Sequence, residues 1–469
     1  MNKVGAFALT LALLCGCAVG PDFHSPKTVM PGTWAGISEK SSEQPSVATT
    51  RPAAVATWWQ NFNDPKLTAL VEEAIKTNLD LRLAESRLRQ ARFTRSVIAG
   101  GLWPSVNASG SYTRSKVGNA PSQDLFETGL DALWELDIFG GTRRNVESAT
   151  ANIHAAQEDL RDVQVSIAAE VALDYIQLRG FQQQIAIAQD NLQAQRHTGE
   201  ITRQRFNAGF VSSLDVANAD AQVATTESAV PVLETSAQQT IYALSVLLAL
   251  PPAELLKDLW ETKPLPVMPP EIPVGLPSDL LRRRPDIRRA EAQLHAATAQ
   301  IGVAAADLFP QFSLVGSLSW QADTLAKLYT GAARTWSVGP SVNWPIFQGG
   351  SIIANVHVQQ ALRDQAYLTY QKTVLTALQD VENALIAYAK EWEHRKSLDD
   401  AVTANRKAVE VSMQLYSEGQ TDFLNVLQAQ GALYSSENAF VQSNSNLGQD
   451  LVALYKALGG GWETQPAGK

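Results

Sequence analysis

The chain has 469 residues, of which 47 are acidic and 38 are basic, so its formal net charge at pH 7 is -9. This sign argues against a phosphate-binding surface and therefore against nucleic acid as a partner. Cys15 and Cys17 are the only cysteines in the sequence. No intramolecular disulfide or thiolate metal site can hold the body of the chain together, so its stability must come from packing and assembly.

The amino terminus has the layout of a secretory signal. Lys3 precedes an apolar run over residues 4–14 that is too short to span a bilayer. The string LLCGC at residues 13–17 resembles the bacterial lipobox, whose last cysteine becomes the acylated first residue of the mature protein. By this resemblance residues 1–16 are the signal peptide and Cys17 is the lipid anchor. The alternative is an ordinary signal cleaved nearby. Because Ala18 rather than an aspartate follows, we expect an outer-membrane address.

The rest of the chain is an internal tandem repeat of one structural unit. A shift of 206 residues aligns the segment from Asp80 to Ser111 with the second half without a gap, and a shift of 210 pairs Trp134 with Trp344 and Gly209 with Gly419. We expect repeat 1 over residues 57–262 and repeat 2 over residues 263–469.

Two segments outside the helices and strands have the composition of linkers. Residues 17–56 form the expected lipidated N-terminal linker. The Pro-rich stretch 261–277 is expected to be an extended linker between the repeats, because proline prevents it from being helical.

Four segments alternate between apolar and polar residues with the period of a β-strand. They lie at about residues 105–115, 125–138, 311–320 and 335–346. About ten residues is enough to cross a bilayer when a strand is tilted. The aromatic residues near the strand ends predict an interfacial girdle of Tyr112, Trp134, Trp320, Trp336 and Trp344. The same alternation would also suit the edge of a soluble β-sandwich.

The polar positions of the second strand are acidic. Glu127, Asp131, Glu135 and Asp137 are expected to face a lumen, because a charge facing lipid is costly.

The remaining sequence predicts unusually long helices. Apolar residues recur at a spacing of seven over residues 143–207 and 349–417, which would each be about 90 to 100 Å long at about 1.5 Å per residue. The helices are expected to fold back as hairpins at Gly209 and Gly419.

Four strands cannot close a barrel, and open sheet edges are not tolerated in hydrocarbon, so several chains must close it together. Two chains would give eight strands and a filled interior, whereas three would give twelve strands and an open passage. A dimer would leave the long helices with nothing to conduct, although periodicity alone does not choose between the two.

Several strings resemble one known family. They are CAVGPDF at 17–23, WWQNFNDPKL at 58–67, WELDIFGG at 134–141, GLPSDLLRRRPDIRRAE at 275–291 and WPIFQGG at 344–350. Together they resemble the outer-membrane efflux proteins related to TolC and OprM, and most of all the lipoprotein branch called NodT. The resemblance implies a homotrimer with a twelve-stranded barrel in the outer membrane and a twelve-helix periplasmic tube. It further implies two partners, a periplasmic adaptor and an inner-membrane pump, commonly of the resistance-nodulation-division class.

Such a passive exit duct for small molecules needs no enzyme activity, cofactor or metal. The sequence contains no HExxH, CxxC, Walker or G-x-S-x-G motif. Two alternatives remain, a conduit for secreted proteins and a periplasmic coiled-coil adaptor or scaffold that never crosses the membrane.

An arginine run at residues 282–284, followed by Arg288 and Arg289, invites interpretation as a binding site. The other interpretation is a helix that starts at Pro285 and carries these arginines on a solvated or inter-protomer face.

The hairpin turns are the predicted periplasmic entrance. The candidate gate residues are Leu424, Asn425, Gln428, Asp422, Asp215 and Asn218. Relatives often place acidic residues where this chain has Asn425 and Gln428, so an acidic ring would come from Asp215 or Asp422. The alternative is that both aspartates cap the returning helices. We expect Leu424 packing and polar contacts of Asn425 and Gln428 to close the entrance until the adaptor opens it.

Overall fold

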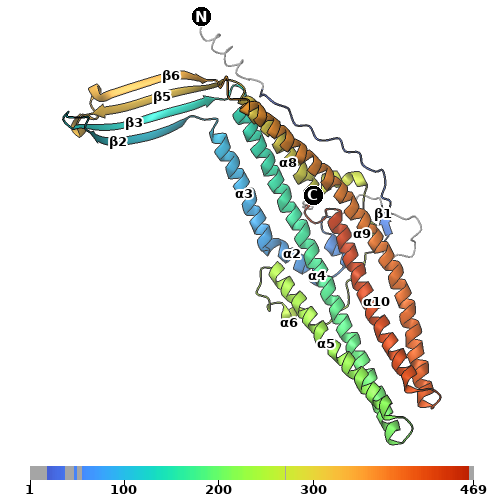
Figure 1. Ribbon diagram of the computed structural model, residues 1–469. Helices are drawn as coiled ribbons and strands as arrows, with labels where there is room; N and C mark the ends of the chain where they lie inside the picture. Colours follow the sequence, from blue (N-terminus) through green and yellow to red (C-terminus); the bar gives the residue numbers. More distant parts are fainter. Residues whose placement is uncertain (1–17, 37–46, 50–54, 270, 464–469) are drawn as a thin grey trace. The chain divides into compact units, whose positions relative to one another are not determined.

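The computed structural model describes residues 18–36, 47–49, 55–269 and 271–463 (Figure 1). The predicted signal peptide and Cys17 lie outside these residues. The chain divides into two compact units. Unit 1 comprises Met1–Thr28, Glu85–Asp159 and Arg288–Thr373, and unit 2 comprises Val29–Ala84, Leu160–Ile287 and Val374–Lys469.

The two halves of the sequence build the same three helices. In the first half these are α3 (Leu79–Gly100), α4 (Gly141–Asn207) and α5 (Ser213–Leu247), and in the second half α8 (Pro285–Ala306), α9 (Ser351–Ser417) and α10 (Phe423–Ala457). Their lengths are 22, 67 and 35 residues in both halves. The shifts between equivalent helices are the 206 and 210 residues found in the sequence. In the described part of the chain, no helix combines the length and the hydropathy needed to cross a membrane.

Unit 1 contains a four-stranded antiparallel sheet (Figure 1). Its order is β2 (Ser105–Ser115), β3 (Gln123–Leu136), β5 (Gln311–Ala322) and β6 (Arg334–Asn343), with the short helices η3 (Leu325–Lys327) and η4 (Gly331–Ala333) between the last two. Each outer strand, β2 and β6, pairs on one side only within the described chain. The sheet therefore has two open edges.

The predicted bounds of three strands differ from the observed ones by up to three residues, and two of these strands end early. The strand expected over residues 125–138 ends at Leu136, and the strand expected over residues 335–346 ends at Asn343. Asp137 leaves the sheet because its carboxylate accepts the backbone N–H groups of Thr142 and Arg143 at the start of α4, at 3.0 and 2.8 Å. β6 ends at Asn343, two residues before Pro345, although Pro340 lies inside the strand. The prediction that Asp137 faces a lumen is therefore also wrong.

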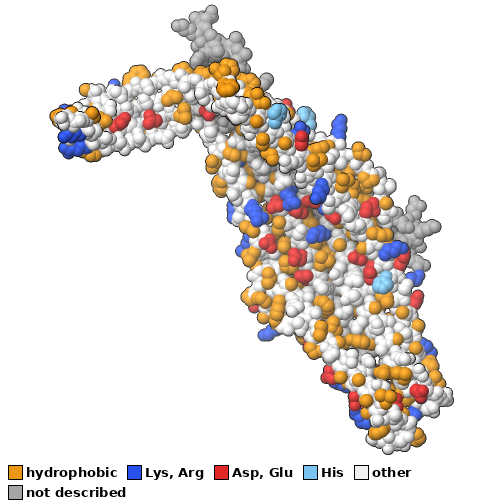
Figure 2. Space-filling view, in the orientation of Figure 1, with side chains coloured by type: hydrophobic (Ala, Val, Ile, Leu, Met, Phe, Trp, Pro, Cys, Tyr) orange, Lys and Arg blue, Asp and Glu red, His pale blue; other side chains and the backbone are white. Residues whose placement is uncertain are grey.

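The strand register separates an apolar face from a polar face. Residues that are directly opposite one another in antiparallel strands share a face. One row joins Ala108, Leu130, Leu318 and Trp336, and the next row joins Val106, Ala132, Gly316 and Val338. The other face carries the rows Asn107, Asp131, Ser317 and Ser337, and Glu135, Ser313 and Ser341. In Figure 2 acidic side chains lie among backbone atoms and side chains that are neither charged nor hydrophobic, on the visible side of this sheet.

Unit 2 contains two helical hairpins, α4 from Leu160 onward with α5 and α9 from Val374 onward with α10, and a set of short elements beside them. These elements are β1 (Val47–Thr49), η1 (Trp58–Phe62), α2 (Pro65–Thr77), α6 (Leu256–Leu259), β4 (Glu271–Pro273), η2 (Pro277–Asp279) and α7 (Leu280–Arg283). Their core includes Trp58, which stacks on Tyr455 with ring centroids 5.2 Å apart.

The two expected linkers are not free connections. β1 and β4 pair as parallel strands, with Val47 opposite Glu271 and Thr49 opposite Pro273. Trp34 is buried, and its indole N–H donates to the carbonyl oxygen of Gly275 at 3.0 Å. The Pro-rich composition excluded a helix in these segments, but it gave no information about their pairing with each other.

The apolar face yields a direct test of the strand assignment. Val338 lies in the interior of β6 and is exposed on this face, whereas its neighbour Ser337 lies on the polar face. We expect Val338→Arg to oppose insertion by about 2 to 4 kcal/mol if the site lies near the membrane midplane, and Leu130→Arg to act in the same way. The measurement is the amount of heat-modifiable trimer in isolated outer membranes.

Ser337→Arg is the matched control and should insert, because its charge faces water. Normal trimer yield from Val338→Arg would contradict the assignment of this face to lipid.

Candidate functional site

The two hairpin turns have the same backbone construction. Gly209 follows α4 and Gly419 follows α9, with φ angles of 79° and 76°. The N–H of the next residue reaches back to the helix, from Phe210 to the Arg205 carbonyl at 2.9 Å and from Gln420 to the Leu415 carbonyl at 2.8 Å. Glycine adopts this left-handed conformation without steric cost, so both helices end at these positions and the chain reverses.

A small hydrophobic core joins the two hairpins near their turns. It contains Ala219, Tyr416, Phe423 and Val426, and all four are buried. The guanidinium of Arg205 on α4 donates to the carbonyl oxygens of Tyr416 and Ser417 and lies 4.6 Å from the centroid of the Tyr416 ring. The first hairpin therefore holds the end of α9. The residue equivalent to Arg205 in the second half is Leu415, so the reciprocal contact is not made.

Three of the candidate gate residues share an uncovered face of α10. Leu424, Asn425 and Gln428 are exposed, whereas Phe423 and Val426 on the opposite side of the helix are buried in the core between the hairpins. Leu424 is 52% exposed. The structure thus brings these three side chains together on a surface that the chain itself leaves free.

The two aspartates near the turns differ. Asp215 forms a capping box at the start of α5, where its carboxylate accepts the Ser212 backbone N–H at 2.9 Å and the Ser212 hydroxyl at 2.8 Å. Asp422 is the N-cap residue of α10, but its exposed side chain makes no capping hydrogen bond. Asn218 is half-buried beside Ala219. The capping interpretation therefore holds for Asp215 and fails for Asp422.

The segment that follows Cys17 is bound to unit 1. The backbone N–H of Val19 donates to the carbonyl of Phe139 at 3.0 Å. The nearly buried Arg144 donates to the Val19 carbonyl at 3.1 Å and to the Asp22 carboxylate at 2.7 Å, and this contact lowers the pKa of Asp22. A side chain at Gly302 would place its Cβ 2.7 Å from the Val19 carbonyl oxygen, so only glycine fits there. These contacts hold residue 19 at the base of β3, and sequence analysis did not predict them.

The predicted girdle aromatics fall at the two ends of the sheet. Tyr112, Trp320 and Trp336 lie toward the hairpin loops. Trp134 lies toward the helices, and Trp344 lies one residue beyond the end of β6. The indole N–H groups of this second pair make equivalent bonds, from Trp134 to the Leu102 carbonyl at 3.0 Å and from Trp344 to the Leu308 carbonyl at 3.2 Å.

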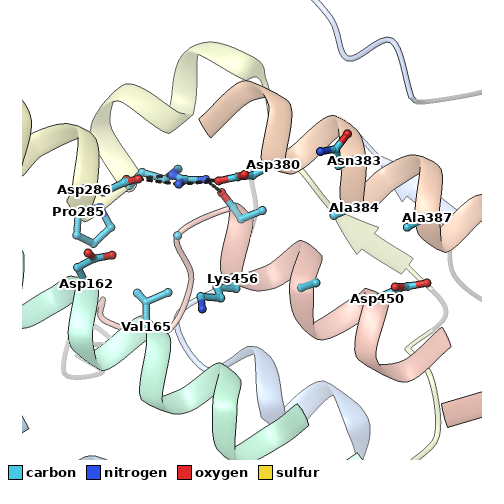
Figure 3. A pocket seen from close by; sticks show the side chains of 14 residues that line it. Asp162, Val165, Pro285, Asp286, Asp380, Asn383, Ala384, Ala387, Asp450 and Lys456 are labelled. Carbon is cyan, nitrogen blue, oxygen red and sulfur yellow. Dashed lines mark hydrogen bonds and ion pairs between the residues drawn. The ribbon is translucent and has the colours of Figure 1, made fainter. Parts of the chain in front are cut away.

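The arginine run has a structural role that the sequence did not predict (Figure 3). The helix start at Pro285 was expected, but the side chain of Arg284 is only 11% exposed. Its guanidinium donates to Asp286, to Asp380 at 3.0 Å and to the carbonyl of Ala457 at 3.0 Å. The expected solvated face is therefore wrong for Arg284, because the end of α10, the start of α8 and the middle of α9 all present oxygen atoms to it. Arg288 and Arg289 pair with Glu158 and Asp159 at 2.8 and 2.6 Å.

The first half contains an equivalent joint without the charge. Asn78 corresponds to Arg284 by the shift of 206. Its amide donates to the carbonyl of Leu247 at the end of α5 at 2.8 Å, and its side-chain oxygen accepts the N–H of Asp80 at 2.8 Å at the start of α3. Leu247 corresponds to Ala457 by the shift of 210. Both joints therefore tie the end of a long helix to the start of a shorter one.

A cavity of about 520 Å³ lies beside Arg284 in unit 2. Figure 3 shows Asp162 of α4 beside Pro285 and Asp286, and Asp450 of α10 opposite Ala384 and Ala387 of α9. Burial, followed by the charge of Glu391, raises the pKa of Asp450 to about 6. No three His, Cys, Asp or Glu side chains in the described segments are placed to hold a metal ion.

Comparison with known proteins identifies the family. A family model described as "Outer membrane efflux protein" matches residues 70–250 and 276–460. The chain is 31% identical over 455 residues to nodulation protein T of Rhizobium leguminosarum bv. trifolii, covering 96% of both chains. It is 32% identical over 475 residues to the toluene efflux pump outer membrane protein TtgC of Pseudomonas putida, covering 98% of this chain and 96% of the relative.

The chain belongs to the outer membrane efflux protein family.

Solved structures agree with this assignment. The fold is similar to the outer-membrane channel OprN, with a TM-score of 0.87 and 39% identity over 95% of this chain and 100% of that chain. It is also similar to the open state of the MtrE channel of Neisseria gonorrhoeae, with a TM-score of 0.81 and 27% identity over 95% and 99% of the two chains. The predicted fold class is confirmed, with four strands per chain of a trimeric barrel that continues into a helical tunnel. This efflux protein is an outer-membrane channel component.

The pKa of Asp450 gives a stability test. Its value in the folded efflux protein, about 6, lies above the usual 3.8, so the folded state favours the protonated form and ionisation of Asp450 destabilises it as the pH rises through 6. We expect Asp450→Asn to raise the thermal midpoint, followed by circular dichroism, at pH 7.5. The gain should shrink as the pH falls and disappear near pH 4.

Asp400→Asn, which changes an exposed acid on α9, is the control and should shift the midpoint little at any pH. An equal gain from Asp450→Asn at pH 4 and pH 7.5 would show that ionisation is not the cause.

Proposed function

We propose that this efflux protein is the passive exit duct of a tripartite system. A periplasmic adaptor and an inner-membrane pump, of the resistance-nodulation-division class, deliver small molecules to it. The observation that carries the proposal is the two-faced sheet: one face is apolar, and the other carries Glu127, Asp131, Glu135 and serines. When three such sheets close a twelve-stranded barrel, the polar faces line a passage wide enough for water-filled transport.

The relatives support the remaining parts of this proposal. Several are described as outer membrane proteins of toluene, solvent or antibiotic efflux pumps. The compounds in these descriptions are chemically diverse, and a polar duct suits such diversity if the pump selects the substrate upstream.

The lipid anchor is a second part of the proposal. Val19 and Asp22 are held on unit 1 by Phe139 and Arg144, so a lipid on Cys17 would lie two residues before the first of these contacts. We expect intact-mass spectrometry of the membrane-embedded protein to show acyl chains on Cys17. We also expect Cys17→Ser to leave a protein that still inserts, because a barrel supplies far more membrane affinity than acyl chains do. An unmodified Cys17 in the wild type would contradict the anchor.

The hairpin turns form the proposed entrance. Leu424, Asn425 and Gln428 occupy a free face of α10, and three chains would bring three copies of this face around the axis. We propose that Leu424 packing and the polar contacts of Asn425 and Gln428 close the entrance at rest, and that the adaptor opens it. The acidic ring at this entrance would come from Asp422, since the carboxylate of Asp215 is engaged in capping.

Single-channel recording tests the entrance. In planar bilayers Leu424→Ala and Asn425→Ala should raise the conductance, because each removes a contact that narrows the duct. Asp422→Asn should weaken block by divalent cations.

Asp215→Asn is the matched control, since the amide oxygen of asparagine can still accept the Ser212 backbone N–H and the ring at Asp422 would be unchanged. Unchanged conductance in both alanine variants would place the constriction elsewhere, and equal loss of block in the two aspartate variants would contradict the ring at Asp422.

A further inference from the structure

The first half of the chain covers a helical face that the second half leaves bare. On α4, Glu158 and Ile176 are buried and Val165 is 3% exposed, because elements of the second half lie against them. The equivalent residues of α9, at a shift of 210, are Leu368, Leu375 and Ile386. All three are exposed large hydrophobic residues, and Leu375 is 67% exposed. The face of α9 that corresponds to a buried interface is therefore uncovered in a single chain.

A second bare face lies on α3. On α8, Ala299 is 1% exposed, whereas the equivalent residue of α3, Phe93 at a shift of 206, is 71% exposed. Leu79, the equivalent of the buried Pro285, is also exposed. Each half of the chain therefore has one uncovered apolar face, on α3 in the first half and on α9 in the second.

The contact between the halves indicates how the two bare faces meet. Within the chain, α4 of the first half contacts α8 through Glu158 and Arg288, and contacts α10 through Asn191 and Glu437 at 3.0 Å. In a ring of three chains the same head-to-tail contact recurs between copies. There α9 of one copy takes the place of α4, and α3 and α5 of the next copy take the places of α8 and α10. Residues that face each other within the chain therefore predict which residues face each other between chains.

The charges at this contact differ in an informative way. Within the chain, Arg284 neutralises Asp286 and Asp380. The equivalent carboxylates of the first half are Asp80 and Glu170, but Asn78 replaces the arginine. Asn78 keeps the hydrogen bond to the helix end and supplies no charge.

A third carboxylate adds to this unbalanced charge. Asp174 lies one turn beyond Glu170 on α4, and burial, followed by the charge of Glu170, raises its pKa to about 6. Within the segments that the structure describes, no ion pair is formed by Asp80, Glu170 or Asp174. The first half therefore carries three acids that form no ion pair in these segments, and one of them, Asp80, directly follows the exposed Leu79.

We propose that Lys372 of the neighbouring copy supplies the missing positive charge to Asp80 and Glu170. Across the contact within the chain, the residue beside Asp286 is Asp162 of α4 (Figure 3). Its equivalent on α9, at a shift of 210, is Lys372, which is exposed. Where Arg284 is replaced by Asn78, the residue across the contact therefore changes from the acidic Asp162 to the basic Lys372.

An apolar contact accompanies this ion pair. Leu375, one turn along α9 from Lys372, packs on Leu79 of the next copy. The equivalent residues within the chain, Val165 and Pro285, line one cavity.

This inference rests on the trimer of the proposed function, and cross-linking tests it separately. The only native cysteines lie at positions 15 and 17. A pair of cysteines introduced into the helices is therefore the only pair in that part of the protein that a cross-linker can join. In the full-length protein in outer membranes, Lys372→Cys combined with Asp80→Cys should be joined between chains by a short bis-maleimide. Denaturing gels should then show bands of two and three chains. The matched control, Asp162→Cys combined with Asp286→Cys, should react within one chain and keep the mass of a monomer.

Charge reversal gives an independent readout. Lys372→Glu should lower the temperature at which the trimer dissociates in detergent, and adding Glu170→Lys should restore it. Lys390→Glu, on the same helix and exposed beside Glu393, should leave the temperature unchanged. If wild-type trimers form but the Lys372 and Asp80 cysteines join no chains, the inference is overturned and the trimeric duct stands. If the wild type forms no trimer, the contact of Lys372 and the trimeric duct are both contradicted.

Discussion

Each half of this chain has one helical face that only another half can cover, and the rest of the architecture depends on this constraint. The first half satisfies it with the second, through Arg288 and Glu158 and the core around Tyr416. The second half has no further partner in its own chain, which leaves Leu368, Leu375 and Ile386 exposed on α9. Burying such surface is strongly favourable in water, so a head-to-tail ring is the arrangement that removes the exposed apolar area.

The sheet imposes the same requirement by a different physical route. β2 and β6 each have one unpaired edge, and unpaired backbone groups are not tolerated in a bilayer. Pairing β6 of one copy with β2 of the next closes the barrel and leaves no edge. One threefold assembly therefore buries the exposed apolar residues of α9 and also pairs the free backbone groups of β2 and β6.

Periodicity predicted those parts of the fold that depend on which face a residue occupies. The alternation along β3 and β6 located the strands, and the spacing of seven located α4 and α9, because both signals arise from regular exposure to two environments. Periodicity gave a wrong prediction where a side chain forms hydrogen bonds with the backbone nearby. Asp137 continues the alternation of β3, but its carboxylate is taken by the start of α4. The capping box of Asp215 is a local contact of the same kind, and the sequence alone does not distinguish it from an acidic ring.

Contacts between distant segments were beyond sequence reasoning. The arginine run indicated only a helix start, since nothing local connects Arg284 to Asp380 or to the end of α10. The internal repeat does carry this information once one contact is known, because Asn78 and Leu247 repeat the joint of Arg284 and Ala457. The most direct test of the account is native mass spectrometry of the full-length protein released from detergent. The account predicts a single species with the mass of three acylated chains, and a predominant monomer or dimer under conditions that preserve a folded barrel would contradict it.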